Sequence, residues 1–251
     1  MLCNPTIEKL QELHLTAMES AYREQLQDTA YQDLAFDERF GFIVDKEHTC
    51  RHNRRLQTRL RNAKLRLAAA VEDIDYRAQR GLDKATMLSL ATCKWIHQHH
   101  NCIVTGPTGA GKTYLACALG HKACREGFTV QYHRAPRLFG ELAIAKGDGR
   151  YAKLLAQLAR FDLLILDDWA TAPLTDEQRR DLFEVIEDRH EQRATLIAAQ
   201  MPIEHWHKTI GDPTLADAIL DRLIHNAHKI NLKGESMRKT KTPLTAATSK
   251  R

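Results

Sequence analysis

The stretch from Gly106 to Thr113 reads GPTGAGKT, and its residue types and spacing point to phosphate chemistry. It fits the pattern G-x-x-x-x-G-K-[ST], a loop whose backbone N–H groups surround the phosphates of a nucleotide. Lys112 would contact the β- and γ-phosphates, and the Thr113 hydroxyl would be a ligand of Mg²⁺. The pattern therefore predicts ATP and Mg²⁺ as cofactors. Its candidate binding residues are Gly106, Pro107, Thr108, Gly109, Ala110, Gly111, Lys112 and Thr113.

The residues on either side of this loop agree with that interpretation. Residues 102–105 form a short apolar run typical of a strand, and residues 112–126 read as a helix that ends at Gly127. Anion binding requires the order strand, glycine loop and helix N-terminus, because the helix dipole adds positive potential there. The alternative is a glycine-rich turn in front of an ordinary core helix, and the context favours the phosphate loop.

Two adjacent carboxylates follow a second apolar run. Residues 161–168 read FDLLILDD, so an apolar strand leads directly to Asp167 and Asp168. Ligands of open α/β sheets bind at the carboxyl ends of the strands, where Asp167 could hold Mg²⁺ through water. Asp168 could then polarise the attacking water. The alternative is a core strand that simply ends in two acids, and a neighbouring phosphate loop makes it the weaker interpretation.

Polar residues after later elements could complete such a site. Gln200 follows the apolar run 195–199, where an amide could sense the γ-phosphate or orient water. Arg222 and Arg238 could neutralise transition-state charge, from the same subunit or from a neighbouring one. The residues alone do not select these two among the chain's many arginines. The candidate catalytic residues are Lys112, Asp168, Gln200, Arg222 and Arg238, and the candidate metal ligands are Thr113 and Asp167.

Bulk properties limit the class of protein. A chain of 251 residues has room for one large domain or two small ones, and its net charge is a modest +5. No apolar run approaches the length of a membrane span, and the polar N-terminus is not a signal peptide. The cysteines show no CxxC spacing, which favours reduced thiols in a cytoplasm. They are Cys3, Cys50, Cys93, Cys102, Cys117 and Cys124.

Hydrophobic periodicity divides the chain into two parts. Residues 6–80 show helical periodicity, and after a break at Gly81 a new helix is expected from Asp83 to about His97. From Asn101 onward strand-like runs alternate with helical stretches, which predicts an α/β fold with a parallel sheet covered by helices. We expect a helical domain at 1–80, an ATPase domain at 81–238 and a basic tail at 239–251. The four strand-like runs are 102–105, 128–133, 161–166 and 194–199.

One segment of the helical part is strongly basic. Residues 51–67 contain seven Lys or Arg and no Asp or Glu. An apolar stripe of Leu56, Leu60, Ala63 and Leu67 could bury against the amino-terminal helices and leave the cations outside. Dense cationic surface suits the phosphates of duplex DNA without reading its sequence, and the alternative is a merely solvated helix face. The candidate DNA-binding residues are Arg51, Arg54, Arg55, Arg59, Arg61, Lys64 and Arg66.

Taken together, these segments resemble the AAA+ ATPases, and within them the IstB-like insertion-sequence ATP-binding proteins, which are relatives of the DnaC helicase loaders. The resemblance extends from about Leu34 to Arg238. It implies that Asp168 is the catalytic acid, Gln200 the first sensor, Arg222 the arginine finger and Arg238 the second sensor. It rests on NRRLQTRLRNAKLRL, EDIDYRAQRGLD, GPTGAGKT, LLILDDW, DPTLADAILDRLIHNAHKI and GESMR.

The resemblance also implies a function. It implies a Mg²⁺-dependent ATPase of the bacterial cytoplasm and nucleoid that assembles as a homo-oligomer on duplex DNA, remodels it and works with a transposase. Two departures from the wider AAA+ pattern stand out. Asp168 replaces the usual glutamate, which predicts slow turnover, and only about twenty residues follow Asn231, so a helical lid would be vestigial.

Three other functions stay open at this point. The first is a DnaC-like helicase loader, which would use the same nucleotide site for a different client. The second is a P-loop kinase, although a kinase needs an acceptor pocket and not a hydrophobic strand ending in paired aspartates. The third is a nucleotide-gated binding protein without turnover.

Overall fold

The computed structural model describes residues 5–77, 80–234 and 237. The chain divides into two compact units, Met1–Thr58 and Arg59–Arg251, and the division falls inside one helix. The division of function at residue 80 that the sequence suggests stays a prediction, because compactness alone does not assign a role to either part.

The first unit is helical, as the periodicity predicts. It contains α1 (Pro5–Glu12), α2 (Thr16–Gln27), the short 3-10 helix η1 (Thr29–Tyr31) and most of α3 (Phe36–Ala63). Glu47 of α3 is only 8% exposed and accepts the backbone N–H groups of Ala17 at 2.9 Å and Met18 at 3.1 Å. These N–H groups open α2 and have no partner within the helix, so a buried carboxylate stabilises the helix start.

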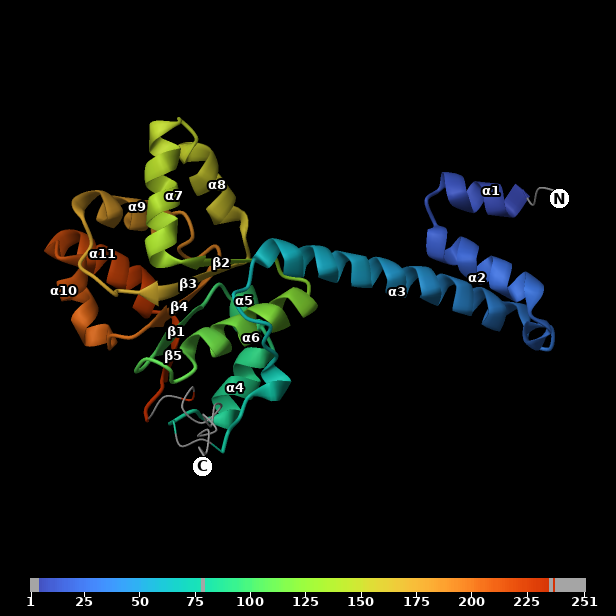
Figure 1. Ribbon diagram of the computed structural model, residues 1–251, viewed down its shortest axis with the longest axis horizontal. Coiled ribbons are helices and arrows are strands. Elements are labelled where there is room, and N and C mark those ends of the chain that lie inside the picture. Colours follow the sequence, from blue (N-terminus) through green and yellow to red (C-terminus); the bar gives the residue numbers. More distant parts are fainter. Residues whose placement is uncertain (1–4, 78–79, 235–236, 238–251) are drawn as a thin grey trace, which may run out of the picture. The chain divides into compact units, whose positions relative to one another are not determined.

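The second unit is built on a five-stranded parallel sheet (Figure 1). Its order is β2-β3-β4-β1-β5, so the connection from β1 to β2 crosses past β4 and β3, and the connection from β4 to β5 crosses past β1. The α/β fold with a parallel sheet is therefore confirmed. The strands are β1 (Asn101–Thr105), β2 (Val130–Arg134), β3 (Leu163–Trp169), β4 (Ala194–Ala199) and β5 (Ala227–Asn231).

Helices cover both faces of this sheet. Leu164 and Leu166 of β3 join the core cluster formed with α7, α9 and α11, whereas Ile165 between them reaches α6 at Gly120. Side chains alternate across a strand, so α6 covers the face opposite α7 (Figure 1). The helices of this unit are α4 (Lys84–Ala91), α5 (Lys94–His97), α6 (Lys112–Arg125), α7 (Ala135–Gly147), α8 (Tyr151–Arg160), α9 (Asp176–Glu187), α10 (Trp206–Ile210) and α11 (Pro213–Ile224), with short 3-10 helices η2 (Val71–Asp73) and η3 (Ile203–His205).

The expected helix from Asp83 to His97 is two helices. Asp83 does cap α4, since its carboxylate accepts the backbone N–H groups of Ala85 and Thr86. The chain then turns at Cys93, whose φ of 57° lies in the left-handed region, and α5 begins at Lys94. A left-handed residue ends an α-helix, so the single-helix prediction was wrong at this point.

The basic helix also ends earlier than its pattern suggests. Helix α3 stops at Ala63, and Lys64 follows with a φ of 51°. Leu67 therefore lies outside the helix and is 41% exposed, while Ala63 is fully buried in the second unit. The expectation of one continuous helix over 51–67 with a single buried stripe was wrong, which changes the surroundings of Arg66.

The five cysteines in the described part of the chain are free thiols, and Cys3 lies outside it. Burial raises the pKa of Cys93 and Cys124 to about 11 and that of Cys102 to about 12. Because the thiolate is the reactive form, these thiols are poor nucleophiles and metal ligands. Within residues 5–77 and 80–234, no helix has both the length and the apolar character of a membrane span.

Candidate nucleotide-binding site

The phosphate loop connects β1 to α6, as its sequence predicts. Gly106 follows the last residue of β1 and has a φ of 146°, and a Cβ at this position would lie 2.5 Å from the carbonyl oxygen of Leu232. Gly111 has a φ of 98° and passes the Arg80 guanidinium so closely that a Cβ would meet it at 2.6 Å. Both positions therefore require glycine, because other residues would add strain and collision.

Lys112 begins α6 and turns its ammonium back into the loop. Its Nζ donates to the carbonyl oxygens of Gly106 at 2.7 Å and Pro107 at 2.9 Å. The side chain is nearly buried, so the charge is held close to the backbone N–H groups of the loop and to the N-terminus of α6. This combination of an ammonium, amide donors and a helix dipole creates a site for an anion.

Asp167 lies next to this loop and is almost completely buried, with 1% of its surface exposed. Its Oδ2 accepts the Thr113 hydroxyl at 2.8 Å and the Tyr132 hydroxyl at 2.7 Å. Burial and the hydrogen bond to Asp167 together raise the pKa of Tyr132, which keeps its hydroxyl protonated as a donor. Thr113 and Asp167 thus present hard oxygen atoms side by side, a donor set that fits Mg²⁺.

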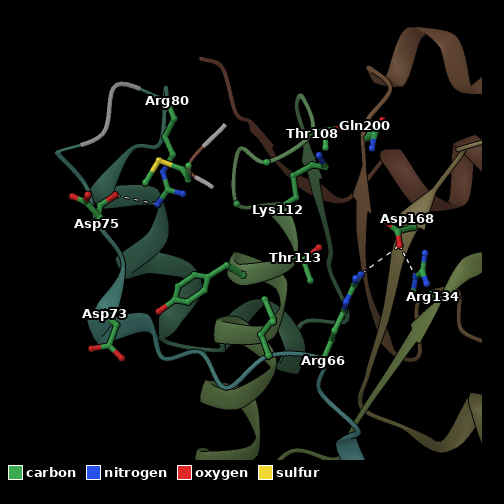
Figure 2. Close-up of a pocket in the computed structure, with 15 residues that line it drawn as sticks. Arg66, Asp73, Asp75, Arg80, Thr108, Lys112, Thr113, Arg134, Asp168 and Gln200 are labelled. Carbon is green, nitrogen blue, oxygen red and sulfur yellow. Dashed lines mark hydrogen bonds and ion pairs between the residues drawn. The ribbon is translucent and has the colours of Figure 1, made fainter. Parts of the chain in front are cut away.

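Asp168 is held by two guanidinium groups, as Figure 2 shows. Its Oδ2 accepts Arg134 Nε at 2.6 Å and lies 3.6 Å from an Nη atom of Arg66. Its backbone has a φ of 56° and donates its N–H to Oδ1 of Asp167 at 2.9 Å. A non-glycine residue in this conformation costs stability, and such strain is found where a side chain must be aimed at a functional site.

These groups surround one cavity of about 560 Å³. Such a volume lies within the range of small-molecule and cofactor sites. Asp168 and Gln200 lie on one side of Lys112, and Arg80 with Asp75 lies on the other (Figure 2). The described residues lining it are Arg66, Leu67, Asp73, Asp75, Arg80, Thr108, Gly109, Gly111, Lys112, Thr113, Tyr114, Arg134, Asp168, Gln200 and Met237.

Arg80 connects the segment before α4 to the phosphate loop. Its side chain donates to the Ala110 carbonyl at 3.2 Å and to the Asp75 carbonyl at 3.0 Å. Burial lowers its pKa, opposed by the nearby Asp75 carboxylate. A buried guanidinium that donates to two backbone carbonyls stabilises this side of the cavity wall and adds positive charge to it.

The sequence-predicted catalytic residues fall into three groups. Lys112, Asp168 and Gln200 line the cavity. Arg222 is absent from the described lining residues, because its side chain on α11 forms an ion pair with Glu187 and lies over the ring of Phe183. Arg238 lies outside the described residues, although its neighbour Met237 lines the cavity and donates its N–H to the Gly109 carbonyl at 3.0 Å.

The seven cations of 51–67 also have different surroundings. Arg54, Arg55 and Arg61 are exposed on α3, and Lys64 is exposed just beyond its end. Arg51 is exposed but pairs with Glu47 at 2.7 Å. Arg59 instead donates its Nε to the Cys124 carbonyl at 2.8 Å, and Arg66 extends into the cavity.

Sequence reasoning missed several residues of the site. Tyr132 and Arg134 could have been considered, because Tyr132 lies near the end of the strand-like run 128–133 and Arg134 directly follows that run. Strands of a parallel sheet have their carboxyl ends at the same edge, where ligands bind. Arg80 lies in a segment that carries the family resemblance, but nothing in its local pattern indicates a guanidinium under the loop. The role of Arg66 was hidden by the assumption that the helix continues past it.

Comparison with known proteins agrees with this geometry. Residues 8–245 match the family of IstB-like ATP binding proteins. The chain is 50% identical over 95% of its length to an insertion sequence ATP-binding protein of Sinorhizobium fredii, of which 98% is covered. It is 34% identical over 85% of its length to the IS21 ATP-binding protein of Pseudomonas aeruginosa, of which 80% is covered.

Solved structures with the same fold include two proteins at low sequence identity. The DnaC helicase loader matches with a TM-score of 0.54 at 17% identity, over 68% of this chain and 100% of that one. DnaI matches with a TM-score of 0.56 at 18% identity, over 66% of this chain and 91% of that one. The phosphate loop and the paired aspartates thus occur in a chain that has the fold of the DnaC helicase loader, belongs to the IstB-like ATP binding protein family and is an ATPase.

Proposed function

We propose that this protein is an ATP-dependent, DNA-binding helper of transposition that assembles on target DNA, remodels it and works with a transposase. The observation that carries the proposal is the cavity around Lys112 and Asp168, found in a chain that is 50% identical to an insertion sequence ATP-binding protein. The cavity supplies the nucleotide chemistry, and the family relationship connects that chemistry to a mobile element.

Each residue of the cavity has a separate role in this proposal. The phosphate loop from Gly106 to Thr113 holds the nucleotide phosphates, with Lys112 as their main cationic contact. Thr113 and Asp167 would hold Mg²⁺, which neutralises phosphate charge when it is bound. Asp168 accepts a hydrogen bond from the attacking water and orients it, and Gln200 fixes that water or the γ-phosphate from the end of β4.

Two arginines complete the proposed site, and one of them comes from a neighbouring subunit. Arg222 is our candidate for an arginine finger acting in trans, because in its own subunit it pairs with Glu187 outside the cavity lining. Arg238 is the candidate second sensor, next to Met237 in the sequence. An arginine delivered by a second subunit makes hydrolysis depend on assembly. This is the reason to expect a homo-oligomer.

The proposed nucleic-acid partner is duplex DNA, bound through its phosphates. Arg54, Arg55, Arg61 and Lys64 are exposed and lie within a segment that has no acidic residue. Such cations neutralise backbone phosphates and provide affinity without sequence preference. A DNA-bound protein without a membrane partner would work in the bacterial cytoplasm at the nucleoid.

A DnaC-like helicase loader is the alternative function. The likeness to the DnaC structure is at 17% identity, which concerns the fold and not the client protein. A loader would bind a replicative helicase, whereas a transposition helper would bind its transposase and duplex DNA. Pull-down with each purified client separates the two.

The experiment that tests the proposal measures ATP hydrolysis with and without duplex DNA, alongside sizing of the assembly. We expect slow basal hydrolysis, stimulation by duplex DNA and a larger assembly in ATP plus DNA than in either alone. Lys112→Ala is the matched control, since it should lose all three effects. Hydrolysis and assembly that do not respond to DNA would contradict the proposed function while leaving the ATPase assignment intact.

A further inference from the structure

Arg66 is the residue whose surroundings differ most from its sequence-based interpretation. One of its Nη atoms lies 3.6 Å from Oδ2 of Asp168 and 4.0 Å from Oδ2 of Asp167. Its side chain is 44% exposed and lines the nucleotide cavity on the same side as Asp168 (Figure 2). Arg66 therefore meets the two carboxylates that the site uses for metal and water.

The backbone around Arg66 is anchored, so its approach to these carboxylates is not the chance position of a long side chain. Leu65 packs into the space left by Gly120 of α6, where a Cβ would lie 3.0 Å from its Cδ2. Burial raises the pKa of the Cys117 thiol, and hydrogen bonds from the backbone N–H groups of Leu67 and Arg66 to this thiol partly oppose the rise. Three successive residues are thus attached to α6, and the guanidinium extends from this attachment into the cavity.

Arg66 and Mg²⁺ would share the same carboxylate oxygen. Oδ2 of Asp167 already accepts the hydroxyl of Thr113, the other candidate metal ligand, and it lies 4.0 Å from the Arg66 guanidinium. A divalent cation bound to this pair would repel a monovalent cation at such a distance. The guanidinium is flexible and partly exposed, so it can move away, whereas Asp167 is buried and fixed by two hydroxyl donors.

We propose that Arg66 competes with Mg²⁺ for Asp167 and Asp168. Arg66 is a positioning residue, and its displacement couples nucleotide binding to a rearrangement of the segment that follows α3. Arg66 gives up both carboxylates when the magnesium–nucleotide complex binds, and residues 64–67 rearrange with it. This inference rests on the proposed magnesium–nucleotide site and is independent of DNA binding.

The test compares Arg66→Gln and Arg66→Lys with Arg61→Gln, which removes an exposed cation three residues before Lys64 and outside the cavity lining. Binding of a fluorescent ATP analogue is titrated with Mg²⁺ in the absence of DNA. Arg66→Gln should lower the Mg²⁺ concentration for half-maximal binding roughly threefold to tenfold, because a repelling charge is gone.

The conservative variant and the control sharpen this result. Arg66→Lys keeps the charge, so its Mg²⁺ requirement should lie near that of wild type, and Arg61→Gln should match wild type. Hydrogen exchange of a peptide covering 62–68 should change on adding Mg²⁺ and nucleotide to wild type. That change should be smaller in Arg66→Gln.

Two results would overturn the proposal. One is a wild-type Mg²⁺ requirement in Arg66→Gln, and the other is an equal shift in Arg61→Gln, which would indicate a general charge effect. If wild type fails to bind duplex DNA, the proposed function fails, but the Mg²⁺ titration still decides the role of Arg66. The two inferences can therefore fail separately.

Discussion

The salt dependence of DNA binding can be worked out from the surroundings of individual cations. Of the seven cations in 51–67, Arg59 donates to a backbone carbonyl and Arg66 faces the cavity. Arg51 pairs with Glu47, which leaves Arg54, Arg55, Arg61 and Lys64 as the four exposed cations best able to meet phosphates. Each phosphate neutralised on duplex DNA contributes about −0.9 to the slope of log K against log[salt], so four predict a slope of about −3.6.

This slope translates into a measurable loss of affinity. Between roughly 50 and 200 mM salt, a slope of about −3.6 weakens binding about 150-fold. Arg54→Ala with Arg55→Ala should leave a slope of about −1.8, and hence a loss of only about 12-fold over the same range. Neither protein should prefer one duplex sequence over another, because no base-reading contact is involved.

The assay is fluorescence anisotropy with labelled duplexes of two unrelated sequences, at four or more salt concentrations. Arg137→Ala with Arg160→Ala is the matched control, since it removes two exposed arginines that lie on α7 and α8. The control should keep the wild-type slope. A wild-type slope in the Arg54→Ala, Arg55→Ala variant would show that these two arginines do not contact phosphates. An equally flattened slope in the control would show that any loss of positive charge has the same effect.

Three further predictions concern the site and the core. Asp168→Asn should bind nucleotide with near wild-type affinity, because Asp167 and Thr113 would still hold the metal, but it should turn over at least about a hundredfold more slowly. Equilibrium binding and single-turnover hydrolysis check this, and loss of binding would show that the two aspartates do not have separate roles. Arg222→Ala should hydrolyse ATP poorly, and mixing it with Lys112→Ala should restore activity, because one intact site can form between the two; failure in mixtures shown to co-assemble would argue for an arginine in cis. Arg189→Met should lower the free energy of unfolding by about 3 kcal/mol or more, because it leaves the backbone carbonyls of Leu158 and Phe161 without their donor. Urea unfolding measures this loss, and a change below about 1 kcal/mol would mean that water replaces the guanidinium.

Most of the α/β fold could be predicted from local pattern. Strands β1, β3 and β4 are buried over nearly their whole length, which is why each contains a continuous hydrophobic stretch. Strand β2 is buried only over its first three residues and is more polar in sequence. The fifth strand, β5, was missed because it lies at the sheet edge and only Ile230 is fully buried in it. The start of α9 also follows from local pattern, since Thr175 and Gln178 form both hydrogen bonds of a capping box.

The part of the site that could be predicted is formed by residues that are close together in the sequence. The phosphate loop is one contiguous segment and the paired aspartates are another, so the chemistry of each could be predicted from the sequence. Arg66, Arg80 and Arg134 come from three separate segments, and only the packing of these segments around α6 and β3 brings them to one cavity. The end of α3 at Ala63 was equally hidden, because Lys64 adopts a left-handed conformation without a glycine or proline to signal it.

If the nucleotide controls DNA binding, the affinity for one duplex must differ in ATP, in ADP and without nucleotide. We predict the tightest binding in ATP, and linkage then requires that DNA favour the ATP-bound assembly by the same factor. In Lys112→Ala the three affinities should become equal, because its phosphate contact is lost. Equal affinities in wild type would show that the nucleotide does not control DNA binding, and would leave a DNA-binding helix with no energetic connection to the ATPase.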